Sequence, residues 1–176
     1  MKLKLLFLTF LFSALSWGQV KIYELTFEAA GGYTTSVAEF SDGSTDYFTR
    51  TEGSNIAAAV AFANIQGSYY FAAQDIDGEG ATPNQTLIIS GVNIAGYTSL
   101  EFRVHLAEDD DGANQDWDGA DYLHFNYQID GGGFNNLLWV ESSGTTNTAP
   151  LIDTDFNGTG DGTEITNSFS QFLQSI

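Results

Sequence analysis

Alternation of apolar and polar residues dominates the middle of the chain. Residues 100–106 read Leu-Glu-Phe-Arg-Val-His-Leu, and residues 122–129 alternate in the same way. A period of two is typical of strands that bury one face and leave the other in solvent. We therefore predict two half-buried strands of antiparallel sheets at these positions.

A glycine-rich turn follows the second of these strands. Residues 130–133 read Asp-Gly-Gly-Gly, and glycine adopts the positive φ angles of tight turns without steric cost. Residues 134–140 are then expected to return as the partner strand of a hairpin. Further strands are predicted at residues 23–28, 57–63, 69–73 and 86–90.

Two segments carry some helical signal. Residues 57–63 contain helix-forming alanines, but Gly53, Asn64 and Gly67 on either side favour a short strand there. Residues 167–176 place apolar side chains at helical spacing after polar residues that are able to cap a helix. A short C-terminal helix is therefore expected.

Strands at this spacing, separated by Gly, Asn and Asp, predict an all-β fold, namely an antiparallel two-sheet β-sandwich. The chain is 43% hydrophobic and 14% aromatic, which is enough for one core. No repeat or linker divides it, so residues 19–176 are expected to form a single domain. Because Phe172, Leu173 and Ile176 are unusual for a solvated terminus, we expect this domain to be truncated at its C-terminus.

The N-terminal segment, residues 1–18, has the pattern of a secretory signal peptide. Lys2 and Lys4 precede an apolar run, and small residues lie at the −3 and −1 positions of a cut before Gln19. The apolar run is shorter than the ~20 residues that cross a bilayer. The expected location is therefore outside the cell or on its surface, with no membrane span.

Charge and composition exclude several classes of protein. The formal net charge of −18 repels phosphate backbones, so no nucleic-acid partner is expected. The absence of cysteine excludes disulfides and thiol chemistry. Bound cations are an economical way to offset the repulsion, and 14 of the 23 acidic side chains lie in residues 74–79, 108–121 and 153–164.

Residues 153–164 have the spacing of an EF-hand-type calcium loop. Counted from Asp153, side-chain oxygens fall at positions 1, 3, 5, 9 and 12, and Gly158 occupies position 6. Calcium takes six to eight hard oxygen ligands, which alternate residues of a tight loop are able to supply. We predict Ca²⁺ ligation by Asp153, Asp155, Asn157, Thr159, Asp161 and Glu164. The alternative is a surface turn in a chain rich in Gly, Asn and Asp.

The second acidic segment, residues 108–121, contains seven carboxylates. They cannot all stay ionised at close range without a cation, which predicts one or more metal sites. The candidate ligands are Asp109, Asp111, Asp116, Asp118 and Asp121, and the alternative is a solvated acidic loop. Trp117 is a candidate platform for stacking a sugar, unless it closes the edge of the core. Residues 74–79 are interpreted first as a turn.

Catalytic patterns are weak. Asp116, Asp118 and Asp121 resemble the carboxylate spacing of some sandwich glycosidases, but glycine interrupts the strand and that pattern has Glu at both ends. No G-x-S-x-G turn is present. His105 and His124 lie on the polar faces of their strands, where partial exposure is the ordinary explanation and a zinc pair is the alternative. We expect no enzyme activity in this domain.

Several short segments of the sequence together resemble a known module. They are Phe40-Ser41-Asp42-Gly43-Ser44 with Asp46-Tyr47-Phe48, residues 70–78, Trp117-Asp118-Gly119-Ala120-Asp121-Tyr122, and the 153–164 loop. They look like the N-terminal jelly-roll module of secreted Gram-negative multidomain proteins that use the type IX route. The resemblance covers nearly all of residues 19–176. It implies a non-catalytic, calcium-stabilised sandwich similar to carbohydrate-binding modules, continuing through a further strand pair beyond Ile176.

The expected function is that of a secreted, calcium-binding accessory module for glycan binding or adhesion. One alternative is a hydrolase, in this domain or in a further one downstream, and another is a structural spacer. Solvent-facing aromatic rings in a row on one sheet favour glycan binding, whereas a deep pocket with converging carboxylates favours hydrolysis. Neither feature would be expected of a spacer.

Overall fold

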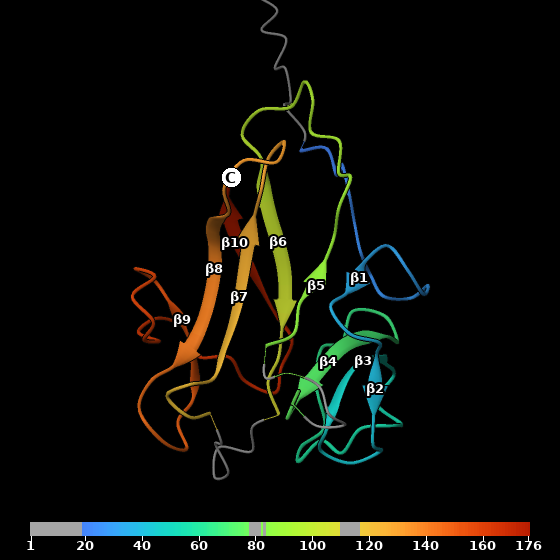
Figure 1. Ribbon diagram of the computed structural model, residues 1–176, viewed down its shortest axis with the longest axis vertical. Coiled ribbons are helices and arrows are strands. Elements are labelled where there is room, and N and C mark those ends of the chain that lie inside the picture. The colour runs from blue at the N-terminus through green and yellow to red at the C-terminus, as the bar shows by residue number, and fades with distance from the viewer. Residues whose placement is uncertain (1–18, 78–81, 83, 110–116) are drawn as a thin grey trace, which may run out of the picture.

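The protein is an all-β sandwich of short antiparallel strands (Figure 1). The computed structural model describes residues 19–77, 82, 84–109 and 117–176, and that part of the chain contains no helix. Accordingly, no apolar helix of membrane-spanning length occurs in these ranges. The strands are β1 (Thr34–Thr35), β2 (Phe40–Ser41), β3 (Tyr47–Thr51), β4 (Tyr70–Gln74), β5 (Leu87–Ile88), β6 (Glu101–Leu106), β7 (Tyr122–Tyr127), β8 (Asn135–Ser142), β9 (Pro150–Asp153) and β10 (Ser170–Ser175).

The three-stranded sheet β7-β8-β9 contains the predicted hairpin. Strands β7 and β8 pair antiparallel, with Leu123 opposite Val140 and His124 opposite Trp139. Asp130 and Gly131 occupy the turn with φ angles of 50° and 73°, which confirms the turn that the glycine run predicted. Strand β9 pairs with the other edge of β8.

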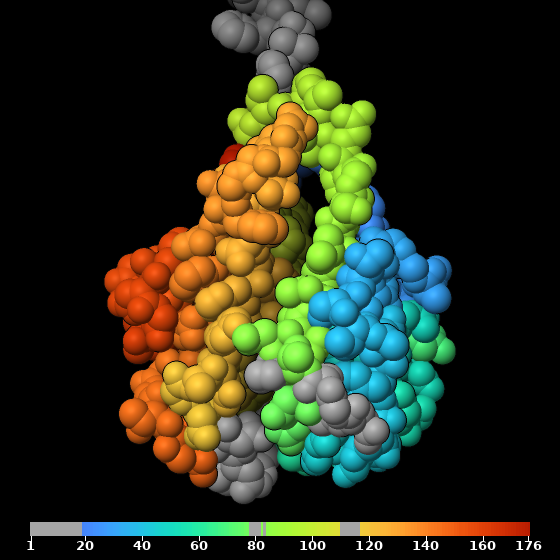
Figure 2. Space-filling model, viewed as in Figure 1, coloured from blue at the N-terminus to red at the C-terminus, as the bar shows by residue number. Residues whose placement is uncertain are grey.

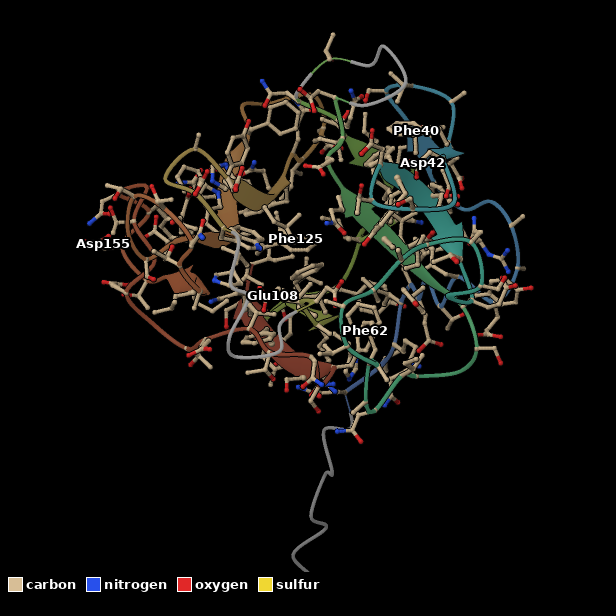
Figure 3. The ribbon with its side chains drawn as sticks, turned by 90° about the horizontal axis from the view of Figure 1, so that it is seen from below. Phe40, Asp42, Phe62, Glu108, Phe125 and Asp155 are labelled. Atoms are coloured by element: carbon tan, nitrogen blue, oxygen red, sulfur yellow. The ribbon has the colours of Figure 1, made fainter. Side chains whose placement is uncertain are left out.

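The main core lies between this sheet and the two-stranded sheet β10-β6. Its buried members are Leu138, Val140, Ile152 and Ile165. Side chains from β6, β7 and β10 pack against them, among them Phe125, which Figure 3 labels on the inner side of its strand. Strand β6 alternates between exposed and half-buried positions, as the sequence pattern predicted.

A second core cluster belongs to the sheet β2-β3-β4. It consists of Tyr47, Ile56 and Tyr70, with Phe62 and Phe169 packed against them. Phe169 immediately precedes β10, and its ring lies 5.6 Å from that of Tyr70 and 5.8 Å from that of Phe62. The segment that enters β10 therefore connects the two clusters.

The predicted C-terminal helix is wrong, because residues 170–175 form strand β10. Leu106 lies opposite Ser170 and Glu101 opposite Ser175, so β10 pairs with β6 along its whole length. One edge of β6 requires backbone hydrogen-bond partners, and a paired strand provides them. A helix cannot, because its backbone N–H and C=O groups are already bonded within the helix.

Residues 23–28 and 57–63 were also predicted as strands, but they run as irregular chain. In the first segment Phe27 has a φ angle of 62°, outside the β region. In the second, backbone pairing is limited to an isolated bridge between Ala63 and Ser168. The strand predicted at 86–90 is shortened to β5.

The different burial of two leucines predicts different losses in the free energy of unfolding when each is replaced by alanine. Leu138 is 2% exposed in the main core, whereas Leu173 on β10 is 48% exposed. Leu138→Ala is expected to lower the free energy of unfolding by about 2–5 kcal/mol, because the cavity cannot collapse fully. Leu173→Ala should change it by no more than about 0.5 kcal/mol. Urea denaturation measures both, and equal losses would contradict the core assignment.

Candidate functional site

The carboxylate of Asp153 organises the acidic loop that follows β9. This residue is 1% exposed, and its Oδ1 accepts hydrogen bonds from the backbone N–H groups of Asp155 and Asn157, both at 3.2 Å. Its Oδ2 accepts the N–H of Gly158 at 2.8 Å. Gly158 has a φ angle of 85°, a conformation that favours glycine, so the position-6 glycine makes the sharp turn.

The other candidate ligands in this loop divide into two groups. Asp155 accepts a hydrogen bond from the side-chain amide of Asn157 at 3.0 Å, so these two lie together beside Asp153. Asp161 instead accepts the N–H and the hydroxyl of Thr154, at 2.9 and 2.8 Å. Thr159 and Glu164 are both exposed.

The loop offers the right kind of ligand for calcium, because carboxylate, amide and carbonyl oxygens are the donors that this ion prefers. Asp153, Asp155 and Asn157 meet on one turn, which fits the first half of the expected set. Across the described ranges, however, no three acidic or histidine side chains gather in a metal-binding group. Hydrogen bonds to the backbone explain the burial of Asp153, and calcium ligation stays a prediction.

The pKa of Asp153 reflects two opposing effects. Burial acts to raise it, but N–H donors from Gly158, Asn157, Asp155 and Phe156 outweigh the burial and lower the pKa below its ordinary value. The carboxylate therefore stays ionised and keeps its hydrogen bonds at neutral pH.

The carboxylates described from the second acidic segment do not meet at one point. Asp109 accepts the N–H groups of Ala59 and Val60, at 2.5 and 2.9 Å, and so fixes the irregular 57–63 segment. Asp118 accepts the N–H of Asn147 at 3.1 Å, and Asp121 accepts the N–H of Asp118 at 2.7 Å. The candidates Asp111 and Asp116 lie outside the described residues.

Figure 3 places three carboxylates from different parts of the chain apart from one another. Asp155 lies at the outer edge of the β9 side, Asp42 lies near β2 on the opposite side, and Glu108 lies between them. A single shared ion therefore cannot serve these three positions.

Trp117, the candidate sugar platform, is half-buried and packs against the main core cluster. Its backbone forms an isolated bridge with Thr148. This placement agrees with the alternative reading, in which the indole closes the edge of the core.

Sequence reasoning missed a row of aromatic rings on the outer face of β7 and β8. His124 stacks on Trp139 with ring centroids 3.8 Å apart and planes 8° from parallel. Tyr122 lies 4.4 Å from His124 at one end, and Phe156 from the acidic loop meets Trp139 edge-to-face at 5.4 Å at the other. We call these four residues the aromatic row. The two ends are the more exposed members, with Tyr122 at 50% and Phe156 at 37%.

Polar groups border the aromatic row. The indole N–H of Trp139 donates to Asn126 Oδ1 at 3.1 Å, and His124 Nε2 lies 2.5 Å from Glu141 Oε1. The hydroxyl of Tyr122 donates to Asn84 Oδ1 at 2.6 Å. Apolar ring surface is thus combined with amide and carboxylate oxygens, a pairing common in small-molecule and sugar sites.

Comparison of the chain with protein-family models, with curated proteins and with solved structures finds no match in any of the three. The arguments for function therefore come from the residues of this site.

The lowered pKa of Asp153 gives a pH-dependent contribution to stability. In the unfolded chain the ordinary pKa of an aspartate, about 3.9, applies. The folded state therefore binds the proton more weakly. The contribution is fully present above the unfolded pKa and is lost as pH falls through the lower, folded pKa.

Asp153→Asn is expected to cost about 1–3 kcal/mol at neutral pH, because the buried hydrogen bonds lose the charged acceptor. The difference from wild type in free energy of unfolding should shrink as pH falls below the unfolded pKa, about 3.9, and through the lower folded pKa. Denaturant titrations at several pH values measure this, with the exposed Asp155→Asn as control. A difference that does not vary with pH would show that the charge of Asp153 does not stabilise the loop.

Proposed function

We propose that this protein is a secreted accessory module that binds glycans through the aromatic row. The observation that carries the proposal is the continuous set of rings from Tyr122 to Phe156 on the outer face of the sheet. Sugar rings present apolar C–H faces and hydroxyl edges. Aromatic rings match the first, and the exposed side-chain amides of Asn84 and Asn126 match the second.

The surroundings of Glu141 favour binding over hydrolysis. Cleavage of a glycosidic bond normally needs two carboxyl groups placed on either side of the bond. Glu141 is 7% exposed and is held by His124, and Asp109 and Asp121 accept backbone N–H groups. A binding role requires no such pair.

Calcium ligation by the 153–164 loop is the second part of the proposal. The ion would supply positive charge to a chain of net charge −18. Phe156 lies between the candidate ligands Asp155 and Asn157 and touches Trp139, so the order of the loop and the position of the aromatic row are connected. Export directed by residues 1–18, and a place outside the cell or on its surface, belong to the same proposal.

Glycan binding is testable with two tyrosines of similar exposure. Tyr122 ends the aromatic row at 50% exposure, while Tyr97 is 48% exposed in the loop before β6. In gels containing xylan, mannan or β-glucan, at least one polysaccharide should retard the wild type. Tyr122→Ala should weaken that retardation about tenfold, as for the loss of one stacking contact, and Tyr97→Ala should not. Equal losses, or no retardation by any of the three, would contradict the proposal.

Calcium binding predicts a change in thermal stability. Extracellular calcium sites have dissociation constants of ~10⁻⁴ to 10⁻³ M, and an ion at 100 times its constant adds about 2.7 kcal/mol. The melting temperature should fall in chelator and recover with calcium. Asp155→Ala should abolish the difference, and Asp77→Ala, another exposed aspartate, should preserve it. A melting temperature that chelator does not change would contradict calcium binding and would support the alternative, in which the loop is only a surface turn.

A further inference from the structure

The acidic loop after β9 contains an Asn-Gly pair, Asn157 followed by Gly158, and no other asparagine of the sequence precedes a glycine. Glycine carries no side chain, so nothing blocks the approach of its backbone nitrogen to the side-chain amide of the preceding asparagine. Both residues are exposed on the outer edge of the β9 side, which Figure 2 shows facing solvent. This pair is therefore the place in the chain where deamidation of asparagine meets the least steric resistance.

Deamidation at this pair needs only water as a further reactant. The backbone nitrogen of Gly158 loses its proton and bonds to Cγ of Asn157. The bond between Cγ and Nδ2 breaks, and Nδ2 takes up the proton and leaves as ammonia. Water then opens the cyclic imide at either of its carbonyl groups, which gives aspartate or isoaspartate at this position.

The carboxylate of Asp153 opposes the first step of this reaction. It accepts the backbone N–H of Asn157 at 3.2 Å and that of Gly158 at 2.8 Å. These bonds hold the backbone on both sides of the Asn157 side chain and restrict rotation of the peptide toward Cγ. The attacking nitrogen must also lose its proton, and a carboxylate beside it disfavours the developing negative charge. Because Asp153 is 1% exposed, solvent screens this repulsion weakly.

A second carboxylate lies beside the leaving group. Nδ2 of Asn157 donates to Oδ2 of Asp155 at 3.0 Å. When the nitrogen attacks, negative charge develops on the side-chain oxygen of Asn157, and enzymes that stabilise such an oxyanion surround it with N–H donors. This loop instead places two carboxylates beside the asparagine. The folded loop is therefore arranged against deamidation.

We propose that Asn157 is a site of spontaneous conversion to aspartate and isoaspartate, and that the Asp153 carboxylate prevents this conversion as long as the loop stays folded. Isoaspartate lengthens the backbone by a carbon atom, so the N–H groups that meet Asp153 would no longer converge on it. Phe156 precedes Asn157 and touches Trp139, so the change would also displace the end of the aromatic row. This proposal does not depend on glycan or calcium binding.

The first test compares folded and unfolded wild type at neutral pH, in chelator so that calcium has no effect. Proteolytic peptides analysed by mass spectrometry locate each converted asparagine. In urea, Asn157 should convert faster than Asn167, which precedes Ser168. In the folded protein, Asn157 should convert at least about tenfold more slowly than in urea, the factor that corresponds to one hydrogen bond with a charged acceptor.

Two variants identify the carboxylates that protect Asn157. Asp153→Ala should accelerate its conversion in the folded protein about tenfold, because the acceptor of both backbone N–H groups is lost. Asp155→Ala should accelerate it by a smaller factor, because only the bond to the leaving amide is lost. Thermal melts, together with an unchanged rate at Asn167, establish that a variant stays folded. Asp155 is exposed, so its variant still tests the proposal if Asp153→Ala does not fold.

Glu28→Ala is the matched control. Glu28 also accepts two backbone N–H groups, those of Ser68 and Tyr69, at 2.7 and 2.9 Å, but in another part of the chain. Its loss should leave the rate at Asn157 unchanged. Equal rates in folded and unfolded wild type, faster conversion of another asparagine in urea, no acceleration by Asp155→Ala, or equal acceleration by Glu28→Ala and folded Asp153→Ala would each overturn the proposal.

Discussion

The hydrogen bond between a carboxylate and backbone N–H groups is the interaction on which the irregular parts of this protein depend. Glu28 accepts the N–H groups of Ser68 and Tyr69, and Asp42 accepts that of Ser44. Asp109 and Asp153 do the same in their own segments. A chain with few basic residues cannot neutralise its acids by ion pairs, so it uses them as charged acceptors that fix turns. Each of these carboxylates fixes its own part of the chain.

Strands with one buried face could be predicted, because burial on a single face produces alternation in the sequence. That signal placed β6 and β7 correctly, and the glycine-rich turn placed β8. Strand β3 is buried at almost every position, and β9 at three of four, so neither alternates. The helical spacing near the C-terminus arose because Phe169 belongs to one core cluster and Phe172 to the other. The contacts of these two residues with separate clusters therefore produced the same spacing as the apolar face of a single helix.

In the candidate site, the sequence predicted the local turn around Asp153 but not the aromatic row. The role of Asp153 in the turn follows from its spacing to Gly158, which is a local property. The aromatic row depends on the register that places His124 opposite Trp139, and on a loop that returns Phe156 to the same face. Cross-strand register is a property of the folded sheet, so period-two patterns within each strand did not reveal which rings would meet.

The environment of Trp139 gives this protein an intrinsic optical reporter. Its indole lies between the imidazole of His124 and the phenyl ring of Phe156, which the acidic loop carries. Trp117 is half-buried at the core, and Trp17 precedes the described chain. Indole emission responds to neighbouring charge and to solvent. The Trp139 contribution would therefore register any rearrangement of His124 or Phe156, without an added label.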